Sequence, residues 1–287
     1  MATENITTSK DLIAQSIDFT EQFTGSISTL LQVLNVTRMQ PMAVGSQIKI
    51  YKSEVTKADG NVAEGEVIPL SKVTRKLADT KELAYKKYRK QTTAEAIQAS
   101  GFAAAVNDTD SKLLRSIQGD IKKDFFDFVQ TGTTKTSGDT FQKAIAQALG
   151  QLAIKWEDDD VQSVLFANPL DFYTYLGDST LTTQTAFGLT YLQNYLGFDT
   201  IILTGAVKQG TIAATASQNL NYAYASMNGS LSQAFSLTTD ETGLIGVVHN
   251  ALTENASYET MALTSGVLFP ERLDGIVVAT VGTPASK

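Results

Sequence analysis

Residues 109–130, TDSKLLRSIQGDIKKDFFDFVQ, carry the strongest structural signal in this sequence. Large apolar side chains recur there every three or four residues, at Leu113, Ile117, Ile121, Phe125 and Phe128. This spacing aligns them on one face of an α-helix. At 1.5 Å per residue, such a helix is roughly 33 Å long. The segment therefore predicts one long amphipathic helix on which other parts of the chain pack.

The flanks of this segment hold residues that begin and end helices. Asn107, Asp108 and Thr109 precede the apolar series and are typical N-cap residues, and Gly132 follows it as a helix stop. A second amphipathic helix is predicted from Thr140 onward.

The stretch AYKKYRKQ, residues 84–91, lies upstream of the long helix and is strongly basic. Residues 75–90 contain seven lysines and arginines against Asp79 and Glu82, whereas the whole chain has a formal charge of −7. An acidic protein repels nucleic acid, and at physiological salt this repulsion extends over about 8 Å. A strip this small is therefore a weak attractant for DNA, but it can lie on the acidic surface of another copy of the chain.

Three interpretations of this strip stay open: a contact between subunits, a DNA-facing surface and a plain solvated face. Tyr85 and Tyr88 point to opposite sides if the segment is a strand, whereas a platform for stacked bases needs aromatic side chains on one side. This spacing favours a strand with contacts on both faces, one of them from a neighbouring subunit. The residues predicted to make contacts between subunits are Arg75, Lys76, Lys81, Tyr85, Lys86, Lys87, Tyr88, Arg89 and Lys90.

The first 45 residues predict an arm. One short helix is expected near Asp11, after the capping residues Thr8 and Ser9, and a second helix over the apolar series from Phe23 to Leu34. Short helices joined by polar Thr/Ser segments are not stable alone, so the arm needs another surface on which to lie.

Residues 46–92 predict a long projecting hairpin. Residues 47–51 alternate polar and apolar side chains, as a half-buried strand does. A turn-rich stretch follows at 58–65, and extended structure resumes from Val67, with Pro69 restricting it to an edge. Because the segment has few large apolar side chains, we expect no core of its own here.

The remainder of the chain alternates short apolar runs with loops. Runs rich in Val and Ile at 163–167, 200–204, 243–248 and 275–281 have the length of buried strands. Pro169 after the first run indicates the start of a further helix. The fold class predicted from these elements is α+β.

Catalytic and metal-binding groups are scarce. The chain has no cysteine, which excludes disulfides and thiolate metal sites. No motif gives His249, the only histidine, an orienting carboxylate and a nucleophile, so a structural role is favoured over a general base. The acidic run 157–160 lacks the ligand spacing of a calcium loop and is interpreted as a solvated turn. We predict no catalytic residue, metal, cofactor or enzymatic activity, and no apolar run long enough for a membrane span.

With its parts in this order, the chain resembles the major capsid protein of tailed bacteriophages of the Hong Kong 97 (HK97) type. The segments that carry the resemblance are ELAYKKYRKQ at 82–91, FFDFVQTG at 125–132, VLFANP at 164–169 and GVLFPERLDGIVV at 266–278. The resemblance covers nearly the whole chain.

This resemblance implies an HK97-like α+β fold of four parts. They are an N-terminal arm (1–45), an extended E-loop (46–92), a P-domain (93–138 and 241–287, with the spine helix at 109–130) and an A-domain (139–240). It also implies that neighbouring subunits complete the arm and the E-loop. The strip 84–91 would be the returning strand of the E-loop.

Partners and location are implied as well. The subunit would assemble with itself into hexamers and pentamers of an icosahedral shell, the head of the virion, around double-stranded DNA contacted non-specifically. The chain begins directly with the arm, which resembles relatives that assemble in the host cytoplasm on a separate scaffolding protein, with a portal protein. Some relatives join a lysine to an asparagine. No motif aligns Lys57 or Lys72 with Asn250 or Asn255 here, so no crosslink is predicted.

Two other functions stay open. An encapsulin-like compartment has the same fold around a cargo enzyme instead of a genome. A small monomeric hydrolase that uses His249 or the acidic run belongs to a different functional class.

Overall fold

The computed structural model describes residues 9–34, 36, 38–157, 160–177 and 183–282. The α-helices are α1 (Ser9–Val33), α2 (Ala94–Phe102), α3 (Asp108–Val129), α4 (Phe141–Lys155), α5 (Pro169–Leu176) and α6 (Ser230–Phe235). A π-helical segment, Ala103–Asn107, joins α2 to α3.

The strands of the described residues form sheets of seven, four, three and two strands. The seven-stranded sheet has the order β5 (Thr134–Gly138), β16 (Ile276–Val281), β10 (Thr211–Ala216), β6 (Ser163–Ala167), β9 (Phe198–Leu203), β8 (Leu189–Tyr195) and β7 (Gln184–Ala186). The four-stranded sheet has the order β12 (Thr238–Thr239), β13 (Ile245–Leu252), β14 (Ser257–Thr264) and β4 (Lys86–Thr93). The three-stranded sheet has the order β1 (Arg38–Pro41), β11 (Leu220–Tyr224) and β15 (Gly266–Pro270). The last sheet pairs β2 (Gln47–Thr56) with β3 (Lys72–Glu82).

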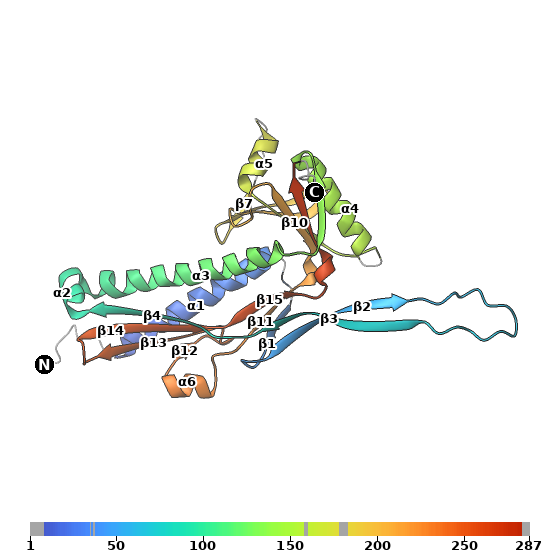
Figure 1. The fold of residues 1–287 in the computed structure, drawn as a ribbon. Coiled ribbons are helices and arrows are strands. Elements are labelled where there is room, and N and C mark those ends of the chain that lie inside the picture. The colour runs from blue at the N-terminus through green and yellow to red at the C-terminus, as the bar shows by residue number, and fades with distance from the viewer. Residues whose placement is uncertain (1–8, 35, 37, 158–159, 178–182, 283–287) are drawn as a thin grey trace.

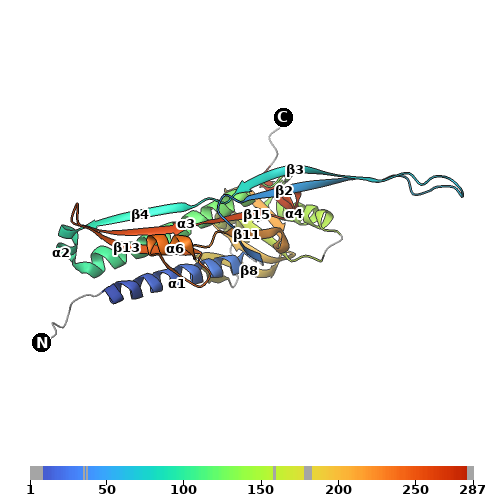
Figure 2. The same cartoon turned by 90° about the horizontal axis from the view of Figure 1, so that it is seen from below.

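These elements form three parts. The four-stranded sheet with α1 and α3 forms an elongated body, the seven-stranded sheet with α4 and α5 forms a block on one side of it, and the hairpin β2/β3 projects from the body. In Figure 1, α3 runs along the four-stranded sheet, and the seven-stranded sheet with α4 and α5 stands near the carboxyl end of α3. Figure 2 shows the same body from below, with α1 along it and the hairpin β2/β3 extending past it. The long helix α3 therefore lies where the body meets the block.

The predicted long helix is confirmed as α3, and its apolar face is buried. Leu114, Ile117, Ile121 and Phe125 all lie in the main hydrophobic core. The predicted N-cap is wrong. Asn107 has helical backbone angles and makes no side-chain cap, because the chain enters α3 from the preceding π-helical segment and not from a loop.

The block contains two of the predicted helices. α4 covers the seven-stranded sheet and buries Phe141 and Leu152 in a second core. α5 begins as predicted, with Pro169 in its first turn, and the Asn168 side chain accepts a hydrogen bond from the Leu170 amide at 2.9 Å. The four apolar runs predicted as strands are confirmed as β6, β9, β13 and β16.

The arm differs from its prediction. Residues expected to form two short helices form the single helix α1, and Thr8, one of the expected caps, lies outside the described residues. The apolar face of α1, including Phe23, Ile27 and Leu30, is buried in the main core beside α3 and β13. Tertiary burial of that face stabilises a helix that is marginal by itself. The surface that completes α1 is therefore part of its own chain.

Strand pairing crosses the predicted domain boundaries, and two strands show this. β16 belongs to the predicted P-domain segment 241–287, yet it joins the seven-stranded sheet between β5 and β10. β11 belongs to the predicted A-domain segment 139–240, yet it pairs with β1 and β15. An apolar run in the sequence indicates that a strand is buried on both faces, but it does not indicate which strand lies beside it.

The hairpin β2/β3 projects from the body, as predicted (Figures 1 and 2). The strand pairing that we expect from Val67 begins only at Lys72, which is opposite Thr56. Pro69 lies in the unpaired part, and proline has no amide donor for a ladder. The last strand of the predicted hairpin, β4, leaves it and pairs with β14 in the four-stranded sheet.

Two glycines near the seven-stranded sheet, Gly138 in β5 and Gly150 in α4, should change the stability in opposite directions when replaced by alanine. A Cβ atom on Gly138 would lie 2.3 Å from the backbone nitrogen of Ala144, so Gly138→Ala must displace backbone. We expect it to lower the free energy of unfolding by about 2 kcal/mol. A Cβ atom on Gly150, within α4, would meet nothing within 4 Å. Gly150→Ala should therefore raise the free energy of unfolding by about 0.5–1 kcal/mol. Urea unfolding of both single variants measures these changes, and effects of the same sign would contradict the packing.

Candidate subunit-contact surface

One face of the hairpin β2/β3 is apolar and exposed. In the ladder, Tyr51 lies opposite Leu77 and Val55 lies opposite Val73, so these four side chains share one face. They are 44% to 66% exposed. Arg75 belongs to the same face, with its guanidinium 5.0 Å from the centre of the Tyr51 ring.

The rest of the hairpin makes this apolar face unusual. On the opposite face, Lys76 forms an ion pair with Glu54 at 2.9 Å. Beyond the ladder, Val67 and Leu70 are 91% and 94% exposed. A two-stranded ribbon is at best marginally stable in water, and contiguous exposed apolar surface marks interaction sites. The hairpin is therefore the strongest candidate for a surface that another molecule covers.

The basic strip 84–91 has a different environment, because most of it forms the edge strand β4. Side chains of β4 alternate between its two faces. Lys86, Tyr88 and Lys90 are partly buried, whereas Lys87 and Arg89 are exposed. Figure 1 shows α3 lying along this sheet, and the partly buried set contacts that helix.

The inward side chains of β4 meet acidic side chains of α3. Lys86 forms an ion pair with Asp124, and the Tyr88 hydroxyl donates a hydrogen bond to Asp120 at 3.3 Å. Burial, reinforced by the negative charge of Asp120, raises the pKa of the Tyr88 hydroxyl to about 12. The strand and the helix are therefore joined by an ion pair and a hydrogen bond to aspartates of α3.

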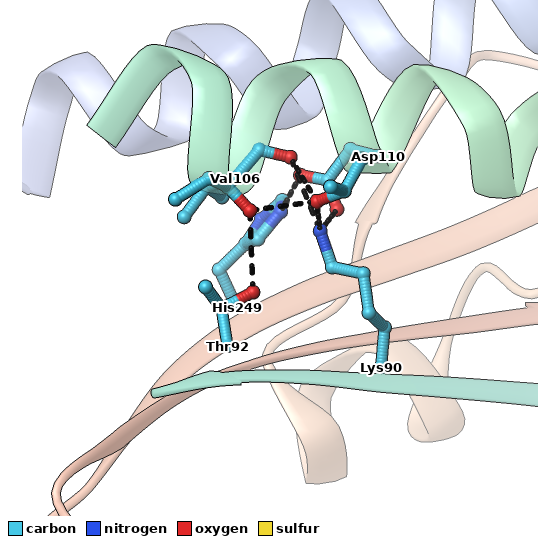
Figure 3. Close-up of polar contacts among 7 residues, drawn as sticks. Lys90, Thr92, Val106, Asp110 and His249 are labelled. Atoms are coloured by element: carbon cyan, nitrogen blue, oxygen red, sulfur yellow. Dashed lines mark hydrogen bonds and ion pairs between the residues drawn. The ribbon is translucent and has the colours of Figure 1, made fainter. Parts of the chain in front are cut away.

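A buried cluster ends this row of contacts (Figure 3). The Lys90 ammonium donates to the Asp110 carboxylate at 2.5 Å and to the Val106 carbonyl at 3.1 Å. His249, from β13, lies with its Nε2 atom 3.0 Å from the other oxygen of Asp110. The side chains of His249 and Asp110 are only 8% and 10% exposed.

The charge state of Asp110 follows from these contacts. Burial alone would raise the pKa of its carboxyl group. Hydrogen bonds from His249 and Lys90, together with their charges, outweigh burial and hold the pKa below its usual value. The cluster therefore contains an ionised carboxylate that links α3 to two strands of the four-stranded sheet.

The predicted contact residues are thus engaged largely within their own chain. Those with an internal ion pair or hydrogen bond are Lys76, Lys81, Lys86, Tyr88, Arg89 and Lys90. Arg75 stacks on Tyr51, Tyr85 packs against the small apolar cluster that includes Met227, and Lys87 is exposed. Contacts from these residues to a neighbouring subunit stay a prediction. Reversing the charges of the strip would break the buried pair of Lys90, so it would not separate assembly from folding.

The structure adds little to the catalytic and metal-binding candidates named from the sequence, His249 and the acidic run 157–160. His249 does gain an orienting carboxylate in Asp110, but the pair is enclosed between α3 and the sheet, which fits a structural role. In the described ranges no group of acidic or histidine side chains could hold a metal, and Asp158 and Asp159 of the acidic run lie outside them. No helix in those same ranges is long and apolar enough to cross a membrane.

Replacing Asp110 tests the buried cluster. Asp110→Asn leaves the Lys90 ammonium without its carboxylate. We expect this to lower the free energy of unfolding by about 3 kcal/mol at pH 7. Because the pKa of Asp110 is lowered on folding, its contribution is present above the unfolded pKa and is lost as pH falls through the folded pKa. The gap between wild type and Asp110→Asn should therefore shrink toward pH 3.

Urea unfolding of the unassembled protein at both pH values measures this gap. Asp127→Asn is the matched control, because Asp127 is an exposed carboxylate on the same helix. Its effect should stay within about 0.5 kcal/mol. A gap for Asp110→Asn that is equally large at low pH would show that the carboxylate charge is not responsible.

Comparison with known proteins gives no match by sequence and several by structure. No protein-family model matches the chain, and no curated protein matches it. Among solved structures, the capsid of an empty GTA particle is 10% identical, with 89% of this chain and 90% of that chain covered at a TM-score of 0.59. The holo-SrpI encapsulin complex from Synechococcus elongatus is 11% identical, covering 90% and 89% at a TM-score of 0.53. A chain from Mycobacterium phage Che8 is 15% identical, covering 82% and 84% at a TM-score of 0.50.

Likeness at this level of identity concerns the fold. It extends over most of this chain and most of each matched chain. The chain therefore has the HK97-like capsid fold that its sequence resemblance implied.

Proposed function

We propose that this chain is the major capsid protein of a tailed phage, a structural protein without enzymatic activity. Its subunits form hexamers and pentamers of an icosahedral head that encloses double-stranded DNA. The shell-forming role is supported by the fold, because the matched chains belong to capsids and an encapsulin. The phage interpretation is supported by matches to chains of phages Che8 and Patience.

The observation that carries the proposal is the uncovered apolar face of the hairpin β2/β3. Tyr51, Val55, Val73 and Leu77 present that face to solvent in the single chain. Burying apolar surface contributes about 25 cal/mol per Å². A second subunit that covers this face gains that free energy, and the polar face with Lys76 stays in water. Repeated around a closed lattice, many such contacts hold a shell together.

The division of labour within the subunit follows from this proposal. The E-loop (46–92) reaches neighbouring subunits through its hairpin, whereas the helix of the arm (1–45) packs on its own chain. The P-domain (93–138 and 241–287) forms the continuous shell, and the A-domain (139–240) meets its copies at symmetry axes. β11 and β16 cross these boundaries and join the domains of one subunit. A separate scaffolding protein and a portal protein complete assembly in the bacterial cytoplasm, and the mature chain resides in the virion.

An encapsulin-like shell is the second candidate. It is favoured by the match to the holo-SrpI encapsulin, which covers as much of this chain as the capsid of the empty GTA particle does, within a percentage point. The two candidates differ in what the shell encloses and not in how subunits meet. The hydrolase alternative has no comparable support, because His249 is buried against Asp110.

Changing the apolar face should abolish assembly without unfolding the subunit. Val55→Glu places a charge among exposed apolar side chains, where it costs the single chain little but opposes burial against a neighbour. Thr56→Glu is the matched control, because Thr56 is the next residue, is exposed, and lies opposite Lys72 on the other face. We expect particles from wild type and Thr56→Glu, and soluble subunits from Val55→Glu.

Light scattering after size-exclusion chromatography and negative-stain microscopy measure particle formation. Circular dichroism shows whether the unassembled Val55→Glu chain is folded. Normal particles from Val55→Glu would remove the hairpin face from the subunit contacts. A wild-type chain that stays a 31 kDa monomer at high concentration would contradict the shell function itself.

The contents of native particles separate the two shell candidates. For a phage head, we expect nuclease treatment of intact particles to leave long double-stranded DNA that is released only on disruption. A compartment would instead release a co-purifying folded protein and no protected DNA. Agarose electrophoresis and mass spectrometry of disrupted particles measure the two outcomes.

A further inference from the structure

A pocket of about 410 Å³ lies between α3 and the carboxyl ends of the parallel strands β6 and β9. In Figure 1, α5 and β7 stand over α3 in this region. The lining comes from several elements. α3 contributes Lys122 and Lys123, the start of α5 contributes Pro169, the β7–β8 turn contributes Gly188, and the segment after β9 contributes residues 204–206.

The lining is basic, although the chain as a whole is acidic. Lys122 and Lys123 are the charged side chains of the lining, which includes no carboxylate. The Lys122 ammonium is held at the wall by the β7–β8 turn. It lies 3.5 Å from the Phe187 carbonyl oxygen and 5.3 Å from the centre of the Phe187 ring. Because an ammonium has three donors, this single weak hydrogen bond leaves others for a ligand. Lys123 is exposed and has no ion-pair partner in the described part of the chain.

Neutral donors of the pocket are held in place. Thr204 is 8% exposed, and its hydroxyl oxygen accepts a hydrogen bond from the Ala206 amide at 3.2 Å, which leaves the hydroxyl proton to be donated. The segment is fastened on two sides. The Asn168 amide donates to the Val207 carbonyl at 2.8 Å, and the Gln130 amide donates to the Ala206 carbonyl at 3.2 Å. A loop fixed in this way loses little conformational freedom when a ligand binds.

We propose that this pocket binds phosphate groups, either of a polynucleotide backbone or of a free polyphosphate. Two ammonium groups and a buried hydroxyl supply hydrogen-bond donors to anionic oxygens, and charge-assisted hydrogen bonds of this kind are the strong ones. The lining has no carboxylate to repel a phosphate or to compete for the lysines. The site is separate from the apolar hairpin face, so it stands or falls independently of the proposed shell function.

The test compares two probes on the full chain and three variants. Tripolyphosphate binding is measured by isothermal titration calorimetry. A fluorescein-labelled duplex of about 20 base pairs is measured by fluorescence anisotropy at about 50 mM and 200 mM salt, because phosphate contacts are salt-dependent. Lys123→Gln removes one charge of the pocket, and Thr204→Val removes the hydroxyl. Lys112→Gln is the matched control, because Lys112 is an exposed lysine on the same helix outside the lining.

We expect Lys123→Gln to weaken binding about tenfold, the value for one charge-assisted hydrogen bond. With the duplex, the same variant should lower the slope of log affinity against log salt by about 1. Thr204→Val should weaken binding a few-fold without changing that slope, and Lys112→Gln should leave the affinity within about twofold of wild type. Circular dichroism and thermal unfolding check that each variant is folded. If Thr204→Val does not fold, the comparison of Lys123→Gln with Lys112→Gln still tests the site.

The two probes identify the source of the phosphate. A site-dependent loss with the duplex supports a polynucleotide ligand, and a loss confined to tripolyphosphate supports a free polyphosphate. The proposal is overturned if wild type binds neither probe at the lower salt. It is also overturned if Lys112→Gln and Lys123→Gln weaken binding equally, because the lysines would then act only through general charge.

Discussion

Burial of one apolar face of α3 holds the molecule together. The rings of Phe125 and Phe126 on this helix pack edge to face with Phe166 of β6, with ring centres 5.6 and 5.8 Å apart. Phe23 and Ile27 of α1 belong to the same core. A single cluster thus joins the arm helix, the four-stranded sheet and the seven-stranded sheet. Because protein interiors are packed densely and transmit displacement, α3 determines where the sheets and the root of the hairpin lie relative to one another.

The sequence predicts that neither the arm nor the hairpin has a core of its own, but the structure completes only one of them. α1 finds its partner surface in its own chain, where Ile27 and Leu30 are fully or almost fully buried. The hairpin finds none in the described chain, and Val55 and Leu77 remain exposed. Length explains the difference. A helix of 25 residues lies along α3 and β13 over much of its course, whereas a ribbon that projects from the body moves away from every surface of that body. The self-association that we propose rests on the second case alone.

The position of charged residues in the sequence likewise does not indicate what those residues contact in the structure. The basic strip 84–91 is matched by the acidic side chains Asp110, Asp120 and Asp124 of α3, so its main electrostatic partner is a helix of the same subunit. This pairing leaves the strip little net charge to offer a neighbour or a nucleic acid. The carboxylate-free lining with Lys122 and Lys123 lies elsewhere on the same helix and keeps its charge. A count of charges along the sequence does not distinguish side chains that are paired within the subunit from side chains that are not.

Local periodicity by itself determined the elements that depend on near neighbours in the chain. The face of α3 follows from a spacing of 3.6 residues and the start of α5 from Pro169. The buried strands β6 and β16 follow from short apolar runs rich in Val and Ile. All these signals act over a few positions. Only the tertiary structure decided which elements meet. Arg89 pairs with Glu259, 170 positions away, and Lys90, Asp110 and His249 come from three separate segments. An alternating strand pattern is satisfied by any partner that buries the right face. The choice among partners depends on the shape of the whole core, which no short stretch of sequence contains.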